Sequence, residues 1–430
     1  MTRFKLSAAL LLVFILGLSA LAAVGSPGDW PRWRGPNLDD ISTEKGLLQA
    51  WPKAGPKLLW TAKRLGPGYS SIAIVGDRIY TMGAHRDAKG GVGIVCINRE
   101  NGEVLWTNFV GNGNEPNCTP TVDPEAGLVF GLTKDGDFLC ADAKTGEAKW
   151  RKNFKKDFGG KMHSGWGYSE SPLIDGDRVI VTPGAKEAQI VALNKTTGEL
   201  VWKSEVPDLG KKGNDGAGYS SIVIGTIGGV KQYIQLVGRG VIGVQASDGK
   251  FLWNYNKVAN GTANIPTPIV KDDFVFCTSG YGDGGSALLK ITKKGNSFEA
   301  TEVYYKSSRE LQNHHGGVIM IGNFIFGGHG HNKGMPFCLE WKTGKVKWLN
   351  EDNEIQGQKS AAVTFADGHL YFRYEDGTVT LVEANPNAYR EKGSFKLPGV
   401  KGPSWPHPVV AGGRLYLRNQ DELLCYDVKK

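Results

Sequence analysis

The chain has few features of a helical, membrane-spanning or nucleic-acid-binding protein. After the N-terminus, no stretch of its 430 residues shows the apolar periodicity of a helix several turns long, and no further apolar run is long enough to cross a membrane. Dense basic runs are also lacking, although the formal net charge is +8, so we expect no nucleic-acid partner. Glycine is abundant instead, with 60 residues, and there are 12 tryptophans. This composition favours many short strands joined by turns.

The one long apolar run occupies residues 6–21, after Arg3 and Lys5, and ends at a small-x-small site. Residues 1–22 therefore predict a secretory signal peptide. Because the first cysteine is Cys96, no cysteine is available to anchor a lipid at a mature N-terminus. We expect an exported monomer, periplasmic or extracellular, that is not a lipoprotein and has no transmembrane segment after cleavage.

An eleven-residue pattern recurs along the chain, with a small residue first, Gly seventh and Trp eleventh. It reads "CINRENGEVLW" (96–106), "CADAKTGEAKW" (140–150), "ALNKTTGELVW" (192–202), "GVQASDGKFLW" (243–253) and "CLEWKTGKVKW" (338–348). A strand ends at the polar third residue, the Gly permits a turn, and the returning strand carries a Trp that can pack on a neighbouring sheet. The pattern thus predicts a strand–turn–strand unit with internal repetition.

A second pattern precedes these units and predicts a tight hairpin. It occurs at residues 68–83, 167–184, 263–280 and 402–419. One hairpin of each kind makes four antiparallel strands, the blade of a β-propeller. Inner hairpins begin near eight positions, Tyr69, Cys118, Ser169, Tyr219, Ile265, His315, Ser360 and Trp405. The sequence therefore predicts eight blades.

The eighth unit stops one strand short, at "LLCYDVKK" (423–430). The missing outer strand is expected from "PKLLW" (56–60), which places Trp60 at the Trp position of the repeat. We therefore predict an all-β, eight-bladed propeller over residues 56–430, closed by pairing the N- and C-terminal strands, with an N-terminal extension at 23–55. The fifth and seventh units lack the Trp, and Tyr304-Tyr305 and Phe395 stand near its place.

The pattern small-x-Asp-x3-Gly-x3-Trp resembles the tryptophan docking motif of the pyrroloquinoline-quinone (PQQ)-repeat β-propellers. The resemblance covers nearly the whole mature chain, with five full copies. That group includes the quinoprotein alcohol dehydrogenases and also the cofactor-free outer-membrane assembly lipoprotein BamB. The segment "DWPRWRGPN" (29–37) resembles the start of exported bacterial proteins with PQQ-like repeats.

The dehydrogenase resemblance implies PQQ over the channel, Ca²⁺ held by Glu, Asn and Asp, a catalytic Asp and often a vicinal disulfide. "GTANIPTP" (261–268) resembles the segment with the Asn ligand, so Asn264 is the matching position, and Glu187 matches the Glu weakly. The segment expected to carry the catalytic Asp, "ELQNHHGG" (310–317), has none, and there is no Cys-Cys pair. The resemblance thus implies the fold more firmly than the chemistry.

Four of the six cysteines share the first position of the eleven-residue pattern, or its equivalent in the last blade. They are Cys96, Cys140, Cys338 and Cys425, and the same position holds Ala192 and Gly243 elsewhere. A buried slot that accepts only small side chains explains this spacing. A disulfide framework is the alternative, but equivalent points of different blades should lie farther apart than the roughly 4.4–6.8 Å between Cα atoms that a disulfide needs.

Four of the eight histidines lie in "NHHGGVIMIGNFIFGGHGH" (313–331). A hairpin turn at Gly322-Asn323 would bring its two ends together on one face of the sixth blade, here called the top face, where the inner strands begin. The candidate metal ligands are His314, His315, His329 and His331. Neutral imidazoles suit a transition metal; hydrogen-bonded or solvated loop histidines are the alternative. Only His369, beside a lower turn, is expected well away from the top face.

One level of the central channel can be followed through all eight blades. It consists of Ser71, Thr119, Ser171, Ser221, Thr267, Gly317, Ala362 and His407. Small residues at this level let the inner strands approach the axis, and His407 and the neighbouring Glu170 are the exceptions suited to binding. Two lysine-rich loops (151–167 and 203–218), with Arg239, predict a basic rim or ordinary solvated lysines. The candidate cofactor-binding residues are therefore Asn264, Glu170, Arg239 and His407.

Three functions are consistent with these patterns. The first is an exported binding module that takes a protein or small ligand on its top face without catalysis. The second is a PQQ- and Ca²⁺-dependent alcohol or sugar dehydrogenase with an altered site. The third is a metal-binding propeller that uses the histidines of the sixth blade. The sequence establishes no cofactor.

Overall fold

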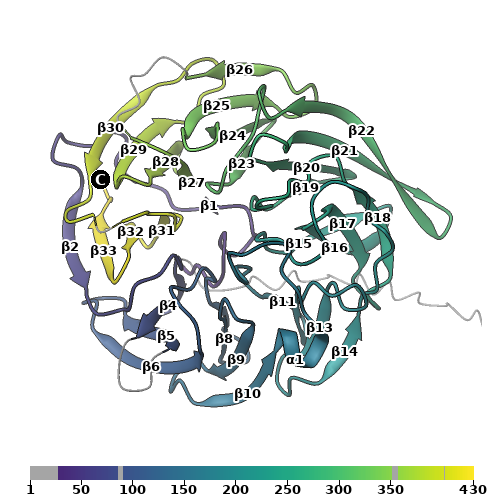
Figure 1. Cartoon of the computed structure of the whole chain (residues 1–430). Coiled ribbons are helices and arrows are strands. Elements are labelled where there is room, and N and C mark those ends of the chain that lie inside the picture. Colours follow the sequence, from purple (N-terminus) through teal and green to yellow (C-terminus); the bar gives the residue numbers. More distant parts are fainter. Residues whose placement is uncertain (1–27, 86–90, 351–356, 401) are drawn as a thin grey trace, which may run out of the picture.

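The computed structural model describes residues 28–85, 91–350, 357–400 and 402–430, which form an eight-bladed β-propeller (Figure 1). Eight sheets surround a central axis, as the sequence predicts, and each contains four antiparallel strands. The predicted signal peptide, residues 1–22, lies outside the described residues. Among the described helices, none has the length and apolar character needed to cross a membrane.

The first four blades follow the chain in order. Blade one contains β3 (Ala73–Val75), β4 (Arg78–His85), β5 (Gly91–Asn98) and β6 (Val104–Gly111). Blade two contains β7 (Thr121–Asp123), β8 (Leu128–Leu132), β9 (Asp137–Asp142) and β10 (Ala148–Asn153), followed by the short helix α1 (Phe154–Phe158). Blade three contains β11 (Leu173–Asp175), β12 (Arg178–Val181), β13 (Val191–Asn194) and β14 (Leu200–Lys203). Blade four contains β15 (Val223–Ile227), β16 (Val230–Val237), β17 (Gly240–Gln245) and β18 (Phe251–Tyr255).

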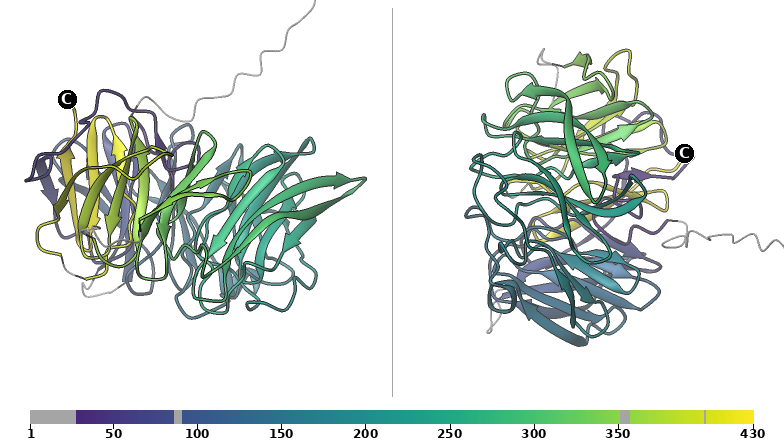
Figure 2. Two further views of the ribbon diagram at one scale, coloured as in Figure 1. Left: turned by 90° about the horizontal axis from the view of Figure 1, so that it is seen from above. Right: turned by 90° about the vertical axis from the view of Figure 1, so that its right-hand side faces the viewer.

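The remaining blades differ in size and composition. Blade five contains β19 (Ile269–Lys271), β20 (Phe274–Ser279), β21 (Gly285–Lys294) and β22 (Ser297–Ser307). Blade six contains β23 (Val318–Ile321), β24 (Phe324–His329), β25 (Met335–Glu340) and β26 (Val346–Leu349). Blade seven contains β27 (Ala361–Ala366), β28 (His369–Tyr374), β29 (Thr378–Glu383) and β30 (Glu391–Lys396), with the added strand β1 (Ile41–Ser42) beside β27. Blade eight contains β31 (Val409–Ala411), β32 (Arg414–Asn419), β33 (Glu422–Asp427) and β2 (Lys57–Ala62). The long β21–β22 hairpin projects outward from the ring (Figure 2).

The ring closes by pairing the two ends of the chain. Strand β2 lies antiparallel to β33 and supplies the outer strand of the eighth blade (Figure 1). Trp60 stands opposite Cys425, the arrangement that Trp106 and Cys96 have in blade one. The predicted closure is confirmed.

The repeated Trp and Gly connect each blade to the next. The Trp106 ring of blade one lies against Gly146 of blade two, and its indole N–H donates to the carbonyl of Lys144 at 3.0 Å. A Cβ at Gly146 would lie 2.7 Å from that ring, and the Gly has φ +78, so the position favours glycine on both counts. The same contact joins Trp60 to Gly102, Trp150 to Gly198 and Trp202 to Gly249. The repeat therefore encodes the contact between neighbouring blades.

The fifth and seventh blades replace the Trp in different ways. Tyr304 takes its place in blade five, packs on Gly344 and donates its hydroxyl proton to the carbonyl of Trp341 at 3.0 Å. In blade seven the register places Gly393 there, two residues before Phe395. Trp51 of the N-terminal extension contacts Gly393 and packs edge-on against Phe395, with ring centroids 5.2 Å apart. The missing Trp of blade seven is thus supplied from outside the repeat.

The N-terminal extension crosses the lower end of the channel and contacts one inner strand after another. Trp30 pairs with Ile74 of blade one, Arg32 donates to the carbonyl of Ile174 in blade three at 3.2 Å, and Arg34 donates to that of Val318 in blade six at 3.0 Å. The segment then runs as β1 beside β27, near the centre of Figure 1. We call residues 30–42 the plug, because they cover the channel from below.

All six cysteines are buried and free. Four of them are Cys96, Cys140, Cys338 and Cys425, and each stands opposite the Trp of its own blade. The predicted small-residue slot is therefore confirmed, and no disulfide is present among the described residues.

We expect a thiol reagent to find no reactive thiol in the native protein and six after unfolding without reductant, because burial raises the pKa of thiols such as Cys118, to about 12, and shields them. Absorbance titration with and without denaturant measures both values. Fewer than six thiols in the unfolded protein would show that disulfides form.

Replacing Trp60 by Ala should destabilise the protein by about 3 kcal/mol, since it removes the aromatic contact that closes the ring. Urea unfolding followed by circular dichroism gives the free energy of unfolding. The control is Trp166→Ala, because Trp166 is 54% exposed in a loop and should contribute little to stability. Equal losses in the two variants would contradict the role of Trp60.

Candidate functional site

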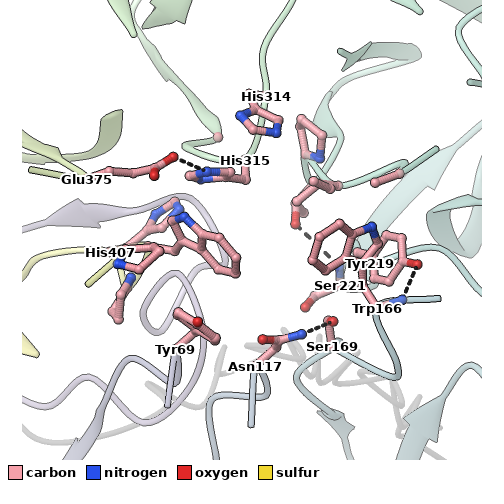
Figure 3. A pocket seen from close by; sticks show the side chains of 18 of the residues that line it. Tyr69, Asn117, Trp166, Ser169, Tyr219, Ser221, His314, His315, Glu375 and His407 are labelled. Atoms are coloured by element: carbon pink, nitrogen blue, oxygen red, sulfur yellow. Dashed lines mark hydrogen bonds and ion pairs between the residues drawn. The ribbon is translucent and has the colours of Figure 1, made fainter. Parts of the chain in front are cut away.

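A cavity of about 540 Å³ lies above the plug on the top face. Its upper wall comes from the residues that lead into the inner strands, each two positions before the channel level predicted from the sequence. They include Tyr69, Asn117, Ser169, Tyr219 and His315, which Figure 3 labels, and also Ile265 and Trp405. The same repeat register thus places seven blades' side chains around one space.

Hydroxyl groups form a hydrogen-bonded chain at the channel level. The backbone N–H of Ser71 donates to Thr119 Oγ1 at 3.1 Å, and that of Thr119 donates to Ser171 Oγ at 3.1 Å. In the same way, the backbone N–H of Ser171 donates to Ser221 Oγ at 3.0 Å, and that of Ser221 donates to Thr267 Oγ1 at 3.4 Å. The predicted level is confirmed over five blades, where small hydroxyl residues join neighbouring inner strands.

The floor of the cavity is built by the plug and His407. Asp40 accepts a hydrogen bond from His407 Nδ1 at 3.2 Å and pairs with Arg34 at 3.5 Å. Trp33 lies edge-on against the His407 ring, with centroids 4.4 Å apart. Within the described residues, the buried Nε2 of His407 has no hydrogen-bond partner. In the tautomer that donates Nδ1–H to Asp40, Nε2 is an acceptor.

Three histidines of blade six stand together on the cavity wall, as the hairpin predicted. The His314 ring lies 4.3 Å from the ring of His315 and 4.3 Å from that of His331, centroid to centroid. Its Nδ1 lies 2.5 Å from Ser360 Oγ and its Nε2 lies 2.8 Å from the hydroxyl of Tyr281. Burial, with the neighbouring imidazoles, lowers the pKa of His314 to about 2, so this ring is neutral at pH 7.

Glu375 completes this wall and was not found by sequence reasoning. It lies in the turn between β28 and β29, and its Oε1 is 2.9 Å from His315 Nε2 (Figure 3). Burial lowers the pKa of His315 despite the carboxylate; burial opposes ionisation of Glu375, but His315 outweighs it and lowers the pKa of the carboxyl. We describe the pair as a neutral imidazole that donates Nε2–H to a carboxylate. The buried Nδ1 of His315 has no partner among the described residues.

The fourth histidine of the predicted metal set faces another way. His329 ends β24, and its Nδ1 accepts a hydrogen bond from the backbone N–H of Gln312 at 3.1 Å. It is absent from the described lining of the cavity, whereas His314, His315 and His331 belong to it. His369 lies beside a lower turn, as expected, with Nδ1 3.1 Å from the carbonyl of Asp367.

Of the four candidate cofactor residues, His407 lines the cavity and the other three make contacts elsewhere. Glu170 is buried inside blade three, where it accepts from the backbone N–H of Thr182. Arg239 pairs with Asp215 and donates to the carbonyl of Gly210 at 2.7 Å. The lysines that line the described cavity, Lys134 and Lys359, come from outside the two lysine-rich loops.

The residues matched to a quinoprotein calcium site do not converge. Asn264 Oδ1 accepts from the backbone N–H of Asn260 at 3.0 Å, and its Nδ2 donates to the carbonyl of Gly238 at 2.9 Å. Glu187 is exposed. Because Asn264 is occupied inside the fold and neither Glu187 nor Glu170 joins it, this donor set does not fit the Ca²⁺ of those dehydrogenases, and we derive no step through PQQ.

Strained backbone gathers at the cavity. Arg34, Tyr281, Asn332 and Lys359 line it and have φ angles of 62, 62, 53 and 66. Residues other than glycine adopt this left-handed conformation at a cost of roughly 1–3 kcal/mol each, and such residues cluster at functional sites. The strain supports this cavity as the site where the protein acts.

Comparison with known proteins places the fold among the PQQ-repeat propellers. Residues 88–350 match the family model described as outer membrane protein assembly factor BamB. A tetrathionate hydrolase of Acidithiobacillus ferrooxidans is 24% identical over 76% of this chain, which spans 54% of the length of that relative.

Solved structures share the fold at low sequence identity. BamB from Moraxella catarrhalis superposes with a TM-score of 0.61 at 15% identity, over 86% of this chain and 99% of that one. A europium-containing methanol dehydrogenase gives 0.63 at 13% identity, over 92% and 90%.

The buried carboxyl of Glu170 should make the free energy of unfolding depend on pH. Burial raises its pKa from the usual 4.5 to about 7, so the folded protein keeps a proton that the unfolded chain releases between these values. Stability should therefore fall by about 3 kcal/mol as pH rises from 4.5 to 7, and Glu170→Gln should abolish this part of the slope. Urea unfolding at pH 5 and pH 8 measures it, with the exposed Glu103→Gln as control. The same slope in Glu170→Gln and wild type would contradict the assignment.

Proposed function

The chain belongs to the PQQ-repeat propeller family described as outer membrane protein assembly factor BamB, and on that premise we propose that it is an exported binding protein. The top-face cavity takes a small organic ligand with a flat ring and hydrogen-bond-donating groups. The observation that carries the proposal is the cavity of about 540 Å³ with aromatic walls and polar groups that converge on it.

Aromatic side chains surround the cavity from several directions. They are Trp33 of the plug, Tyr69, Trp166, Tyr219, Tyr281 and Trp405. Tyr69 and Trp405 are stacked on each other, with ring centroids 4.1 Å apart, and both line the cavity. A ring-shaped ligand gains contact area and favourable ring geometry against such walls.

Two acceptors on the wall and floor indicate the polarity of the ligand. His315 Nδ1 and His407 Nε2 are buried and have no partner among the described residues, while the opposite nitrogen of each ring contacts a carboxylate. An unsatisfied buried acceptor costs roughly 1–3 kcal/mol. A hydroxyl or amine proton of a ligand would recover this energy after a small movement of the rings.

The other functions are less well supported. A quinoprotein dehydrogenase needs a calcium site, but the Asn264 side chain is already hydrogen-bonded to Asn260 and Gly238. Moreover, the carbonyl oxygens of an oxidised quinone are acceptors, which do not complement acceptor nitrogens. A protein partner would have to insert a segment into the cavity, and this remains an outcome of the test below.

Catechol, a flat ring with two hydroxyl donors, is the probe for this proposal. We expect saturable quenching of tryptophan fluorescence when it is added, without oxygen, to metal-free protein, because Trp33 and Trp405 line the cavity. Veratrole, in which both hydroxyls are methylated, should bind about 10- to 100-fold more weakly, as two donors are lost.

The protein control separates the cavity from the outer surface. Trp405→Ala should weaken catechol binding at least about tenfold, whereas Phe109→Ala, at a side chain 46% exposed on β6, should not change it. Equal binding of catechol and veratrole, or no saturable binding, would overturn the proposed ligand class. Binding of an envelope protein to the wild type but not to Trp405→Ala, with no saturable binding of catechol, would instead indicate a protein partner.

A further inference from the structure

Two imidazoles and one carboxylate meet on the cavity wall. The ligand atoms of His314, His315 and Glu375 all lie within 4.8 Å of one another, and no other group of three such residues does so in the part of the chain that the structure describes. His314 and His315 lead into the inner strand of blade six, and Glu375 comes from a turn of blade seven (Figure 3). Three donors from two blades therefore converge on one point.

The donors are close to the spacing that an ion requires. Tetrahedral zinc with bonds of about 2.0–2.1 Å has ligand atoms roughly 3.3 Å apart. The Glu375 Oε1 to His315 Nε2 distance is 2.9 Å, and the widest separation in the group is within 4.8 Å. A small rotation of side chains would bring all three into range, and the proton on His315 Nε2 would move to Nδ1 when that nitrogen binds the ion.

We propose that His314, His315 and Glu375 bind a divalent transition-metal ion whose remaining coordination positions face the top cavity. Two His and one carboxylate form the donor set of catalytic zinc sites and of non-haem iron sites, which keep positions open for water or substrate. This ligand set differs from the one predicted from the sequence, because it includes Glu375 and does not include His329. His329 instead accepts a hydrogen bond from the Gln312 N–H away from the cavity.

Neighbouring groups are placed to support the ion. Ser360 Oγ lies 2.5 Å from Nδ1 of His314, and the Tyr281 hydroxyl lies 2.8 Å from its Nε2. One of these contacts would hold the ring while the other nitrogen binds the metal. Such outer partners fix the ring and its tautomer. The His331 ring is tilted against the His314 ring, with centroids 4.3 Å apart, and also lines the cavity.

The proposed metal site is independent of the proposed organic ligand, because the protein can bind the ion when no organic ligand is present. When both are present, the open positions offer a direct bond to a ligand hydroxyl oxygen. Zinc binding and catechol binding to metal-free protein are separate measurements. Failure of one therefore leaves the other standing.

Equilibrium dialysis of the metal-free full chain against Zn²⁺ tests the inference. We expect one zinc per wild-type chain, and binding at least about 100-fold weaker in Glu375→Gln and in His314→Gln. His369→Gln is the matched control, because His369 lies beside a lower turn and should leave uptake unchanged. Co²⁺ in place of Zn²⁺ should give the visible absorption of a tetrahedral site in wild type and in His369→Gln alone.

Glu375→Gln keeps an oxygen that can accept from His315, so this variant should fold, and its melting curve checks that. Absence of zinc uptake by wild type would overturn the inference. Uptake unchanged in a folded Glu375→Gln or His314→Gln would overturn it as well, since the ion would then lie elsewhere.

Discussion

Pairing of β2 with β33 is the constraint on which the rest of the structure depends. Eight sheets can share one axis only when the last blade receives its outer strand, and the chain takes that strand from its N-terminal side. Because β2 follows residues 28–55 directly, closure also holds that segment against the propeller. The Trp60–Gly102 contact then joins blade eight to blade one in the way that Trp106 and Gly146 join blade one to blade two.

The plug turns an open channel into a cavity with a chemically defined floor. Arg34 and Asp40 are almost wholly buried, and a buried ion pair is tolerable only with good geometry and further hydrogen bonds. Arg34 donates to the carbonyls of Leu38 and Val318, and Asp40 orients His407. The interactions that hold the plug thus also orient the His407 ring for binding. Glu375 orients the His315 ring in the same way.

Much of the fold could be predicted from the sequence because each blade repeats one local rule. A small residue opposite Trp, and a Gly that contacts the Trp of the preceding blade, identify the outer strands and the ring closure. The inner hairpins identify the channel level. Trp51 could not be placed, because it fills blade seven from a segment without the repeat. Glu375 was missed because a carboxylate in the turn "YEDG" (374–377) resembles any solvated turn residue, and its partner His315 belongs to another blade. The path of residues 30–42 is likewise set by contacts with distant strands.

The central claim is that the cavity above the plug is where this protein binds its ligand. Crystals soaked with a mixed set of small hydroxylated ring compounds and of size-matched compounds without donors test it most directly. We predict electron density for hydroxylated rings in the cavity that Trp405 and the blade-six histidines line, within hydrogen-bond distance of His315 or His407. Compounds bound only at other surfaces, with this cavity left empty, would contradict it.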